Sequence, residues 1–118
     1  MSHSFRELEN GIVVVELAGK LIGGSGAEGI PRDVRIRIDD GKRRFIFDFH
    51  EVTYADSTGI GAVLKAFSAL AEVGGRMVFT RVNKRIHQVL SIMRLDTVIQ
   101  IFETEEQAVQ ALGENQAP

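Results

Sequence analysis

The 118-residue sequence predicts an open α/β sheet that is mostly parallel and has an antiparallel edge. Two observations support this prediction. Apolar strand-like runs alternate along the chain with segments whose apolar residues recur every three or four positions, as on a helix face. Ahead of that alternation, two strand-like runs flank a turn dipeptide. We therefore expect an open mixed sheet of about five strands with about four helices.

The first two strands are predicted to form a hairpin. Residues 5–8 and 12–17 are rich in strand-forming side chains and flank Asn10-Gly11. This dipeptide readily takes the positive φ angles that a type I′ turn requires. The glycine-rich residues 23–26 follow, and no Gly-Lys-Ser/Thr sequence comes after them, so we expect a flexible loop rather than a phosphate-binding loop.

Residues 30–38 fit two patterns. Ile30, Val34 and Ile38 recur every four residues, as on a helix, whereas residues 34–38 alternate as in a half-buried strand. Pro31 suits the first turn of a helix. We favour a helix, because a parallel crossover to the next strand usually requires one.

The next predicted strand is central in the sheet. Residues 44–49 are almost continuously apolar, which is typical of a strand covered on both faces. Residues 50–57 are expected to form a loop, and a helix of about four turns should follow Asp56 and end at Gly74-Gly75.

Two further strands and two helices complete the prediction. Residues 76–80 and 97–102 read as strands. Asn83 is the expected N-cap of a helix whose buried positions are Ile86, Val89, Leu90 and Met93. Thr104 and Gln107 have the spacing of a capping box before a last helix, which Gly113 should end.

Length and composition indicate one domain over residues 1–118, with a core of about residues 5–113 and a frayed tail at 114–118. The net charge of −2 gives no overall attraction to nucleic acid or anionic lipid. The absence of cysteine excludes disulfides and Cys-ligated zinc. No secretory signal and no apolar run near the roughly 20 residues of a membrane span are visible, so we expect a cytoplasmic protein.

The chemistry concentrates at residues 56–59, Asp-Ser-Thr-Gly. Loops that leave the carboxyl ends of parallel strands gather on one edge of a sheet, where sites usually form. Asp56 is expected to cap the next helix by accepting from the backbone N–H of Thr58 or Gly59. Ser57 then lies on the first turn, exposed, because the apolar stripe begins only at Ile60.

Other interpretations of this segment were weighed. Asp, Ser and Thr at the start of a helix are often plain caps. Gly59 and Gly61 allow two interpretations: they open the surface to a macromolecule, or they let the helix pack closely on a strand. The segment is not a nucleophile elbow. An esterase that uses Ser57 with His50 lacks a recognisable oxyanion arrangement, so we expect no enzyme activity, cofactor or metal.

The segment from Phe47-Asp48-Phe49 to Ile60-Gly61 resembles the phosphorylation-site region of STAS domains, the anti-sigma factor antagonists of bacterial partner-switching systems. The family pattern is an apolar strand, a short loop, Asp-Ser-Ser/Thr-Gly-Leu/Ile-Gly and an amphipathic helix. The likeness extends to residues 19–21, 74–78 and 83–95 and covers about residues 5–113. The chain departs from the family after the Gly-x-Leu stretch, because the aspartate that commonly follows it in the family is missing here.

The resemblance implies that Ser57 is phosphorylated by an anti-sigma factor that is itself a serine kinase. The unmodified form would bind that kinase and release a sigma factor, and a serine phosphatase would reset it. Asp56 and Gly59 match the flanks of the acceptor, and Thr58 is a secondary candidate. The expected contact surface comprises Asp56, Ser57, Thr58, Gly59, Gly61, Arg81 and Lys84.

Arg81 and Lys84 enter this surface by position, since together with Arg85 they follow the strand at residues 76–80 and would form a basic rim at the edge that carries Ser57. They are otherwise ordinary solvated charges. An alternative function is a STAS module of a stressosome-like scaffold or of a lipid ABC transporter complex. The sequence leaves the oligomeric state open between monomer and weak dimer.

Overall fold

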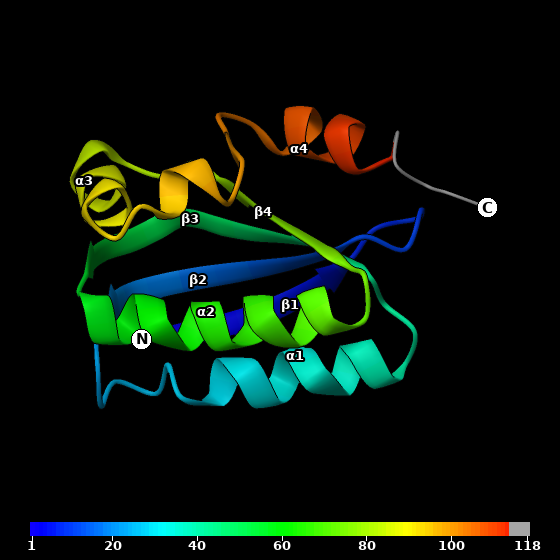
Figure 1. Cartoon of the computed structure of the whole chain (residues 1–118), viewed down its shortest axis with the longest axis horizontal. Helices are drawn as coiled ribbons and strands as arrows, with labels where there is room; N and C mark the ends of the chain where they lie inside the picture. Colours follow the sequence, from blue (N-terminus) through cyan, green and yellow to red (C-terminus); the bar gives the residue numbers. More distant parts are fainter. Residues whose placement is uncertain (114–118) are drawn as a thin grey trace.

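The computed structural model describes residues 1–113 of the chain, as one five-stranded sheet with helices on both faces (Figure 1). The strand order is β1-β2-β3-β4-β5, so each strand lies beside its neighbour in the sequence. β1 (Ser2–Glu7) is antiparallel to β2 (Val13–Leu21). β3 (Arg44–Ala55), β4 (Arg76–Thr80) and β5 (Ile101–Phe102) continue the sheet in parallel. The predicted fold class is therefore confirmed.

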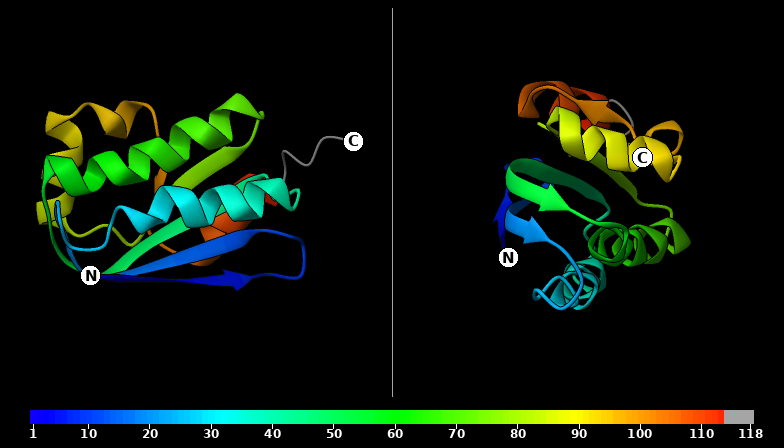
Figure 2. Two further views of the ribbon diagram at one scale, coloured as in Figure 1. Left: turned by 90° about the horizontal axis from the view of Figure 1, so that it is seen from below. Right: turned by 90° about the vertical axis from the view of Figure 1, so that its left-hand side faces the viewer.

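The helices form layers on the two faces of the sheet (Figure 2). α1 (Gly29–Asp39) and α2 (Ser57–Glu72) lie side by side on one face, and α4 (Glu105–Gly113) covers part of the other. α3 (Lys84–Ile92) and the 3₁₀ turn η1 (Leu95–Thr97) follow β4 near the carboxyl end of β3. α1 confirms the helical interpretation of residues 30–38, because Ile30, Val34 and Ile38 are its buried residues.

The sheet separates two apolar cores. The larger core lies under α1, α2 and α3 and contains Phe45, Phe47 and Phe49 of β3. The smaller core lies under α4 and contains Ile46 of the same strand. Successive side chains of a strand point to opposite faces, so β3 supplies both cores. This arrangement explains its almost continuous apolar sequence and confirms its central position.

The first hairpin is confirmed, but its predicted turn type is wrong. Gly11 has a φ of +86°, whereas Asn10 is not among the described residues with positive φ. A type I′ turn requires positive φ at both central residues. The Gly11 N–H donates instead to the Leu8 carbonyl at 3.0 Å, and the Leu8 N–H donates to the Ile12 carbonyl at 2.8 Å.

Two strand boundaries also differ from the prediction. Residues 50–55 were expected to be a loop, but they continue β3. They do so because β2 extends far enough to pair with them, with Leu21 opposite Ala55. β5 contains only Ile101–Phe102 instead of residues 97–102. The N–H groups of Val98 and Ile99 both donate to the Leu95 carbonyl. These hydrogen bonds form a turn, so residues 97–99 are not extended and the strand begins later.

The predicted helix caps are confirmed. The Asn83 side chain accepts from the Ile86 N–H at 2.9 Å, and the Thr104 hydroxyl accepts from the Gln107 N–H at 3.1 Å. Within α3 only Ile86 and Leu90 of the predicted buried residues are fully buried. The predicted frayed tail at 114–118 lies outside the described residues. None of the helices in residues 1–113 has the length and apolar character of a membrane span.

Candidate functional site

The carboxyl end of β3 passes directly into α2 through Asp56. Asp56 has an extended backbone, and its Oδ1 accepts from the Gly59 N–H at 2.8 Å. Its own N–H donates to the Leu21 carbonyl at 3.1 Å, which fixes the residue to the end of β2. The predicted cap is therefore present, and it satisfies one of the free N–H groups in the first turn of α2.

Ser57 is the first residue of α2 and is exposed. Its hydroxyl makes no hydrogen bond to any other side chain or backbone group within residues 1–113. The N-terminus of a helix favours negative charge, because unpaired N–H groups and the helix dipole point there. The serine is thus accessible to a visiting enzyme, and the surroundings of its hydroxyl tolerate an added anion.

The two glycines of the first turns have different roles. A Cβ built on Gly59 would lie 1.9 Å from the Leu21 carbonyl oxygen, so glycine is required for the close approach of α2 to β2. A Cβ on Gly61 would meet nothing within 4 Å. Gly59 therefore supports the close-packing interpretation, whereas Gly61 leaves an open place on the surface.

Thr58 is exposed and lies against the glycine-rich segment. A Cβ on Gly23 would lie 2.7 Å from the Thr58 methyl group, so the loop and the start of α2 are in contact. Glu28 holds this loop, since its carboxylate accepts from the N–H groups of Gly24 at 2.8 Å and Gly26 at 3.1 Å. Hydrogen bonds from its own N–H and from these two glycines lower the pKa of Glu28. Glu28 was not among the predicted functional residues, although an acidic residue just after a run of glycine N–H groups indicates this kind of contact.

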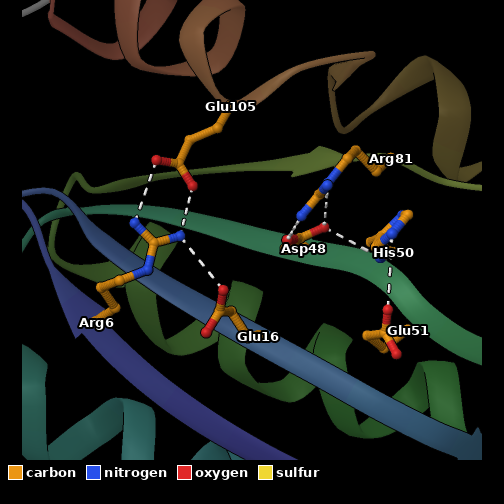
Figure 3. Close-up of polar contacts among 7 residues, drawn as sticks. All are labelled: Arg6, Glu16, Asp48, His50, Glu51, Arg81 and Glu105. Carbon is orange, nitrogen blue, oxygen red and sulfur yellow. Dashed lines mark hydrogen bonds and ion pairs between the residues drawn. The ribbon is translucent and has the colours of Figure 1, made fainter.

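Arg81 is engaged within the protein rather than free at a rim (Figure 3). Its Nη2 lies 2.7 Å from Asp48 Oδ2, and its Nε donates to Oδ1 at 3.2 Å. The His50 N–H also donates to the same carboxylate at 3.0 Å. Burial alone would raise the pKa of Asp48, but the hydrogen bonds from Arg81 and His50 outweigh it and lower the pKa. The sequence analysis had not paired Arg81 with Asp48.

α3 lies at the same end of the molecule as the start of α2 (Figure 1). Lys84 is the first residue of α3 and is exposed, and it forms no ion pair with the other described residues. The preceding Asn83 donates from its amide to the Val52 carbonyl at 3.3 Å, which ties α3 to the last residues of β3. Of the two cations in the predicted contact surface, Lys84 alone keeps its charge free of an internal partner.

His50 does not meet Ser57. It lies on β3, and the strand continues to Ala55 before α2 begins. At about 3.3 Å per residue, this extended chain separates the two residues by roughly 20 Å. The His50 ring lies 3.6 Å from Glu51 instead. Residues 1–113 also hold no group of three or more His, Asp or Glu side chains that could bind a metal ion.

The comparison with protein families gives a match over most of the chain. The family model described as "STAS domain" matches residues 6–108. Among curated proteins, the anti-sigma F factor antagonist of Paenibacillus polymyxa is 24% identical over 111 residues, which cover 90% of this chain and 91% of that protein. A Thermotoga neapolitana protein, named as the homolog of an anti-sigma factor antagonist, is 26% identical over 73 residues. That alignment covers 62% of this chain and 65% of the relative.

Solved structures share the fold at low sequence identity. An anti-sigma factor antagonist from Thermotoga maritima superimposes with a TM-score of 0.85 at 18% identity, covering 94% of each chain. SpoIIAA in its unphosphorylated form gives a TM-score of 0.75 at 23% identity, covering 95% of this chain and 98% of that one. The phosphorylated form of the Bacillus SpoIIAA gives 0.73 at 24% identity, covering 93% and 98%. The matched family model and the shared fold agree, and the chain belongs to the STAS domain family.

Proposed function

We propose that the chain is an anti-sigma factor antagonist that is switched by phosphorylation of Ser57. Its relative from Paenibacillus polymyxa, aligned over 91% of that protein's length, bears this functional name. One observation of this chain carries the proposal. Ser57 presents an exposed hydroxyl without an internal partner at the start of a 16-residue helix capped by Asp56.

The unmodified serine suits a close interface. A neutral hydroxyl loses little on desolvation if it finds a hydrogen-bond partner. Gly61 leaves the neighbouring surface low. Thr58 is exposed in the first turn of α2 and Lys84 at the start of α3, the helix at the same end of the molecule. In this proposal the unphosphorylated chain binds an anti-sigma factor serine kinase through this surface and thereby frees a sigma factor.

Phosphorylation would reverse that binding by charge alone. A phosphate adds about −1.5 to −2 charges at pH 7. In the free domain, the N-terminus of α2 stabilises the added charge and water solvates it, so the fold is unchanged. In the complex, the phosphate must be desolvated beside the Asp56 carboxylate, which weakens binding by several kcal/mol. A serine phosphatase would restore the binding form.

The site is tested by incubating the chain with the anti-sigma factor serine kinase of its source organism and ATP, and then mapping the product by mass spectrometry. We expect one phosphate, on Ser57. Ser57→Ala should abolish the modification while keeping kinase binding. Thr58→Ala is the matched control and should be phosphorylated like the parent.

Two results would contradict the proposal. Equal phosphorylation of Ser57→Ala and the parent would place the acceptor elsewhere. Tight binding to the kinase without any phosphorylation would point to a constitutive contact, as in a scaffold, rather than a switch.

A further inference from the structure

The outer face of α1 carries four exposed residues that no other part of the described chain covers. They are Arg32, Arg35, Ile36 and Asp39. The Ile36 side chain is 52% exposed, which makes it one of the few large apolar residues on the surface. At 100° per residue, the four positions fall within a stripe about 100° wide, on the side of the helix opposite Ile30, Val34 and Ile38. We call these four residues the α1 stripe.

The α1 stripe borders a hollow between α1 and α2. This hollow has a volume of about 810 Å³. On the α2 side it is lined by Gly61, Leu64 and Lys65, and Gly61 leaves it open because no side chain is present there. α1 and α2 lie side by side at this place in both views of Figure 2. The surface is therefore concave and partly apolar, and it can receive another helix.

The charges of the α1 stripe are available to a partner. The Asp39 carboxylate forms no ion pair or hydrogen bond with other described residues, and neither does the Arg35 guanidinium. Arg32, whose side chain is 77% exposed, forms an ion pair among the described residues only with Asp33, at 3.3 Å. The Asp33 carboxylate is shared, because it also contacts the His3 ring at 2.8 Å. Arg32 therefore keeps most of its hydrogen-bonding capacity for a partner.

The positions of Arg32 and Asp39 are self-complementary in charge. Arg32 and Asp39 lie two helical turns apart, on either side of Arg35 and Ile36. If a second α1 runs antiparallel about a twofold axis between positions 35 and 36, Arg32 of each copy lies opposite Asp39 of the other. The two Ile36 side chains then meet near the axis, with the two Arg35 side chains beside them. A partner of one charge sign would leave either the arginines or the aspartate unmatched.

We infer that the α1 stripe is a self-association surface on which a second copy of this chain packs its own α1 antiparallel. The contact centres on one short helix, so its area is below that of standard stable interfaces, and the dimer is weak. Ser57 does not line the hollow, so this inference does not depend on the proposed function.

The first test measures the association of the full chain by analytical ultracentrifugation over a range from about 1 μM to about 1 mM, typical of weak complexes. We expect a monomer–dimer equilibrium within this range. Ile36→Lys adds two cations to the two Arg35 guanidinium groups near the axis and should weaken the dimer about 100-fold or more. Ile92→Lys is the matched control, because Ile92 of α3 is 83% exposed and lies outside the stripe, and it should associate like the parent.

The second test exchanges the charges. Arg32→Glu and Asp39→Arg should each weaken self-association about tenfold, because each change makes two facing pairs repulsive. An equimolar mixture of these two variants should form a heterodimer of about the parent's affinity, because every facing pair is again attractive. Circular dichroism checks that each variant is folded.

Three results would overturn the inference. The parent could remain monomeric over the whole range. Ile36→Lys could dimerise as tightly as the parent, or Ile92→Lys could be the variant that dissociates. The mixture of charge variants could fail to associate more tightly than either variant alone.

Discussion

β3 carries one aspartate in its middle and leads into another at its carboxyl end, and the two have opposite surroundings. Asp48 is 5% exposed and binds the Arg81 side chain and the His50 N–H. Asp56 accepts one backbone N–H, and the Ser57 hydroxyl beside it is exposed without an internal partner. Both aspartates hold their part of the chain in place, but only the second leaves a reactive group open.

This difference separates a structural cluster from a candidate switch. At Asp48, both carboxylate oxygens accept hydrogen bonds from Arg81, and these contacts fix the end of β4 against β3 (Figure 3). A partner that bound Arg81 would have to compete with this buried carboxylate. At Ser57 nothing has to be displaced before a partner or a kinase can bind. The following predictions test whether the two regions differ in this way.

The largest effect is expected from Gly59→Ala, which tests how tightly α2 is seated at the Ser57 end. The new methyl group would lie 1.9 Å from the Leu21 carbonyl oxygen, and the backbone of β2 cannot move aside cheaply. We expect a loss of at least about 3 kcal/mol in the free energy of unfolding, measured by urea denaturation. Gly61→Ala is the control. It meets nothing within 4 Å and should stabilise the helix by about 0.5–1 kcal/mol. Equal effects of the two changes would refute the assigned roles.

The next effect is expected at the closed cluster. Arg81→Met leaves the Asp48 carboxylate buried without its cation, and we expect a loss of about 2 kcal/mol. The value is below the range for a fully buried pair, because the Arg81 side chain is 43% exposed. Lys84→Met, which removes a cation without an internal partner, should change the free energy of unfolding by less than about 0.5 kcal/mol. Similar losses in both variants would show that the Asp48 cluster is not special.

The pH dependence of stability should also report Asp48. The pKa of Asp48 is lowered in the folded protein despite its burial. A carboxyl with a depressed folded pKa contributes stability that is fully present above its unfolded pKa of about 3.9 and is lost as the pH falls toward the folded value. We therefore expect the stability difference between the parent and Asp48→Asn to shrink between about pH 5 and pH 3. Urea denaturation at several pH values measures it, and a difference that stays constant would argue against the ionised pair.

The smallest effect is expected from the cap of α2. Asp56→Ala removes the acceptor of the Gly59 N–H and should cost about 1 kcal/mol. Asp56→Asn keeps an acceptor oxygen and should cost clearly less. The same urea experiment measures both, and a loss in Asp56→Asn as large as that in Asp56→Ala would mean that capping is not the role of this residue.

The parts of the molecule that could be predicted from sequence are those set by local interactions. The caps at Asp56, Asn83 and Thr104 depend on bonds that span three residues, so their sequence spacing was sufficient. The central position of β3 followed from its apolar composition. The helical choice for residues 30–38 needed one additional argument from topology, because two periodicities fitted the same residues.

The parts that could not be predicted depend on partners distant in the sequence. β3 extends to Ala55 because β2 pairs with it, and the strand-forming residues Val52, Thr53 and Tyr54 do not by themselves identify that distant partner. Arg81 and Asp48 are 33 residues apart, so their pairing is visible only once β3 and β4 are aligned. The basic rim of Arg81, Lys84 and Arg85 was predicted without that knowledge, and the structure leaves Lys84 and Arg85 without an internal ion pair among the described residues.

The central claim is that charge on residue 57 decides partner binding, and it is tested most directly by comparing two forms of one chain. The dissociation constant for the anti-sigma factor kinase is measured by calorimetry for the unmodified protein and for the protein carrying a single phosphate on Ser57. A penalty of several kcal/mol predicts binding at least about 100-fold weaker for the phosphorylated form. Equal dissociation constants for the two forms would contradict the account.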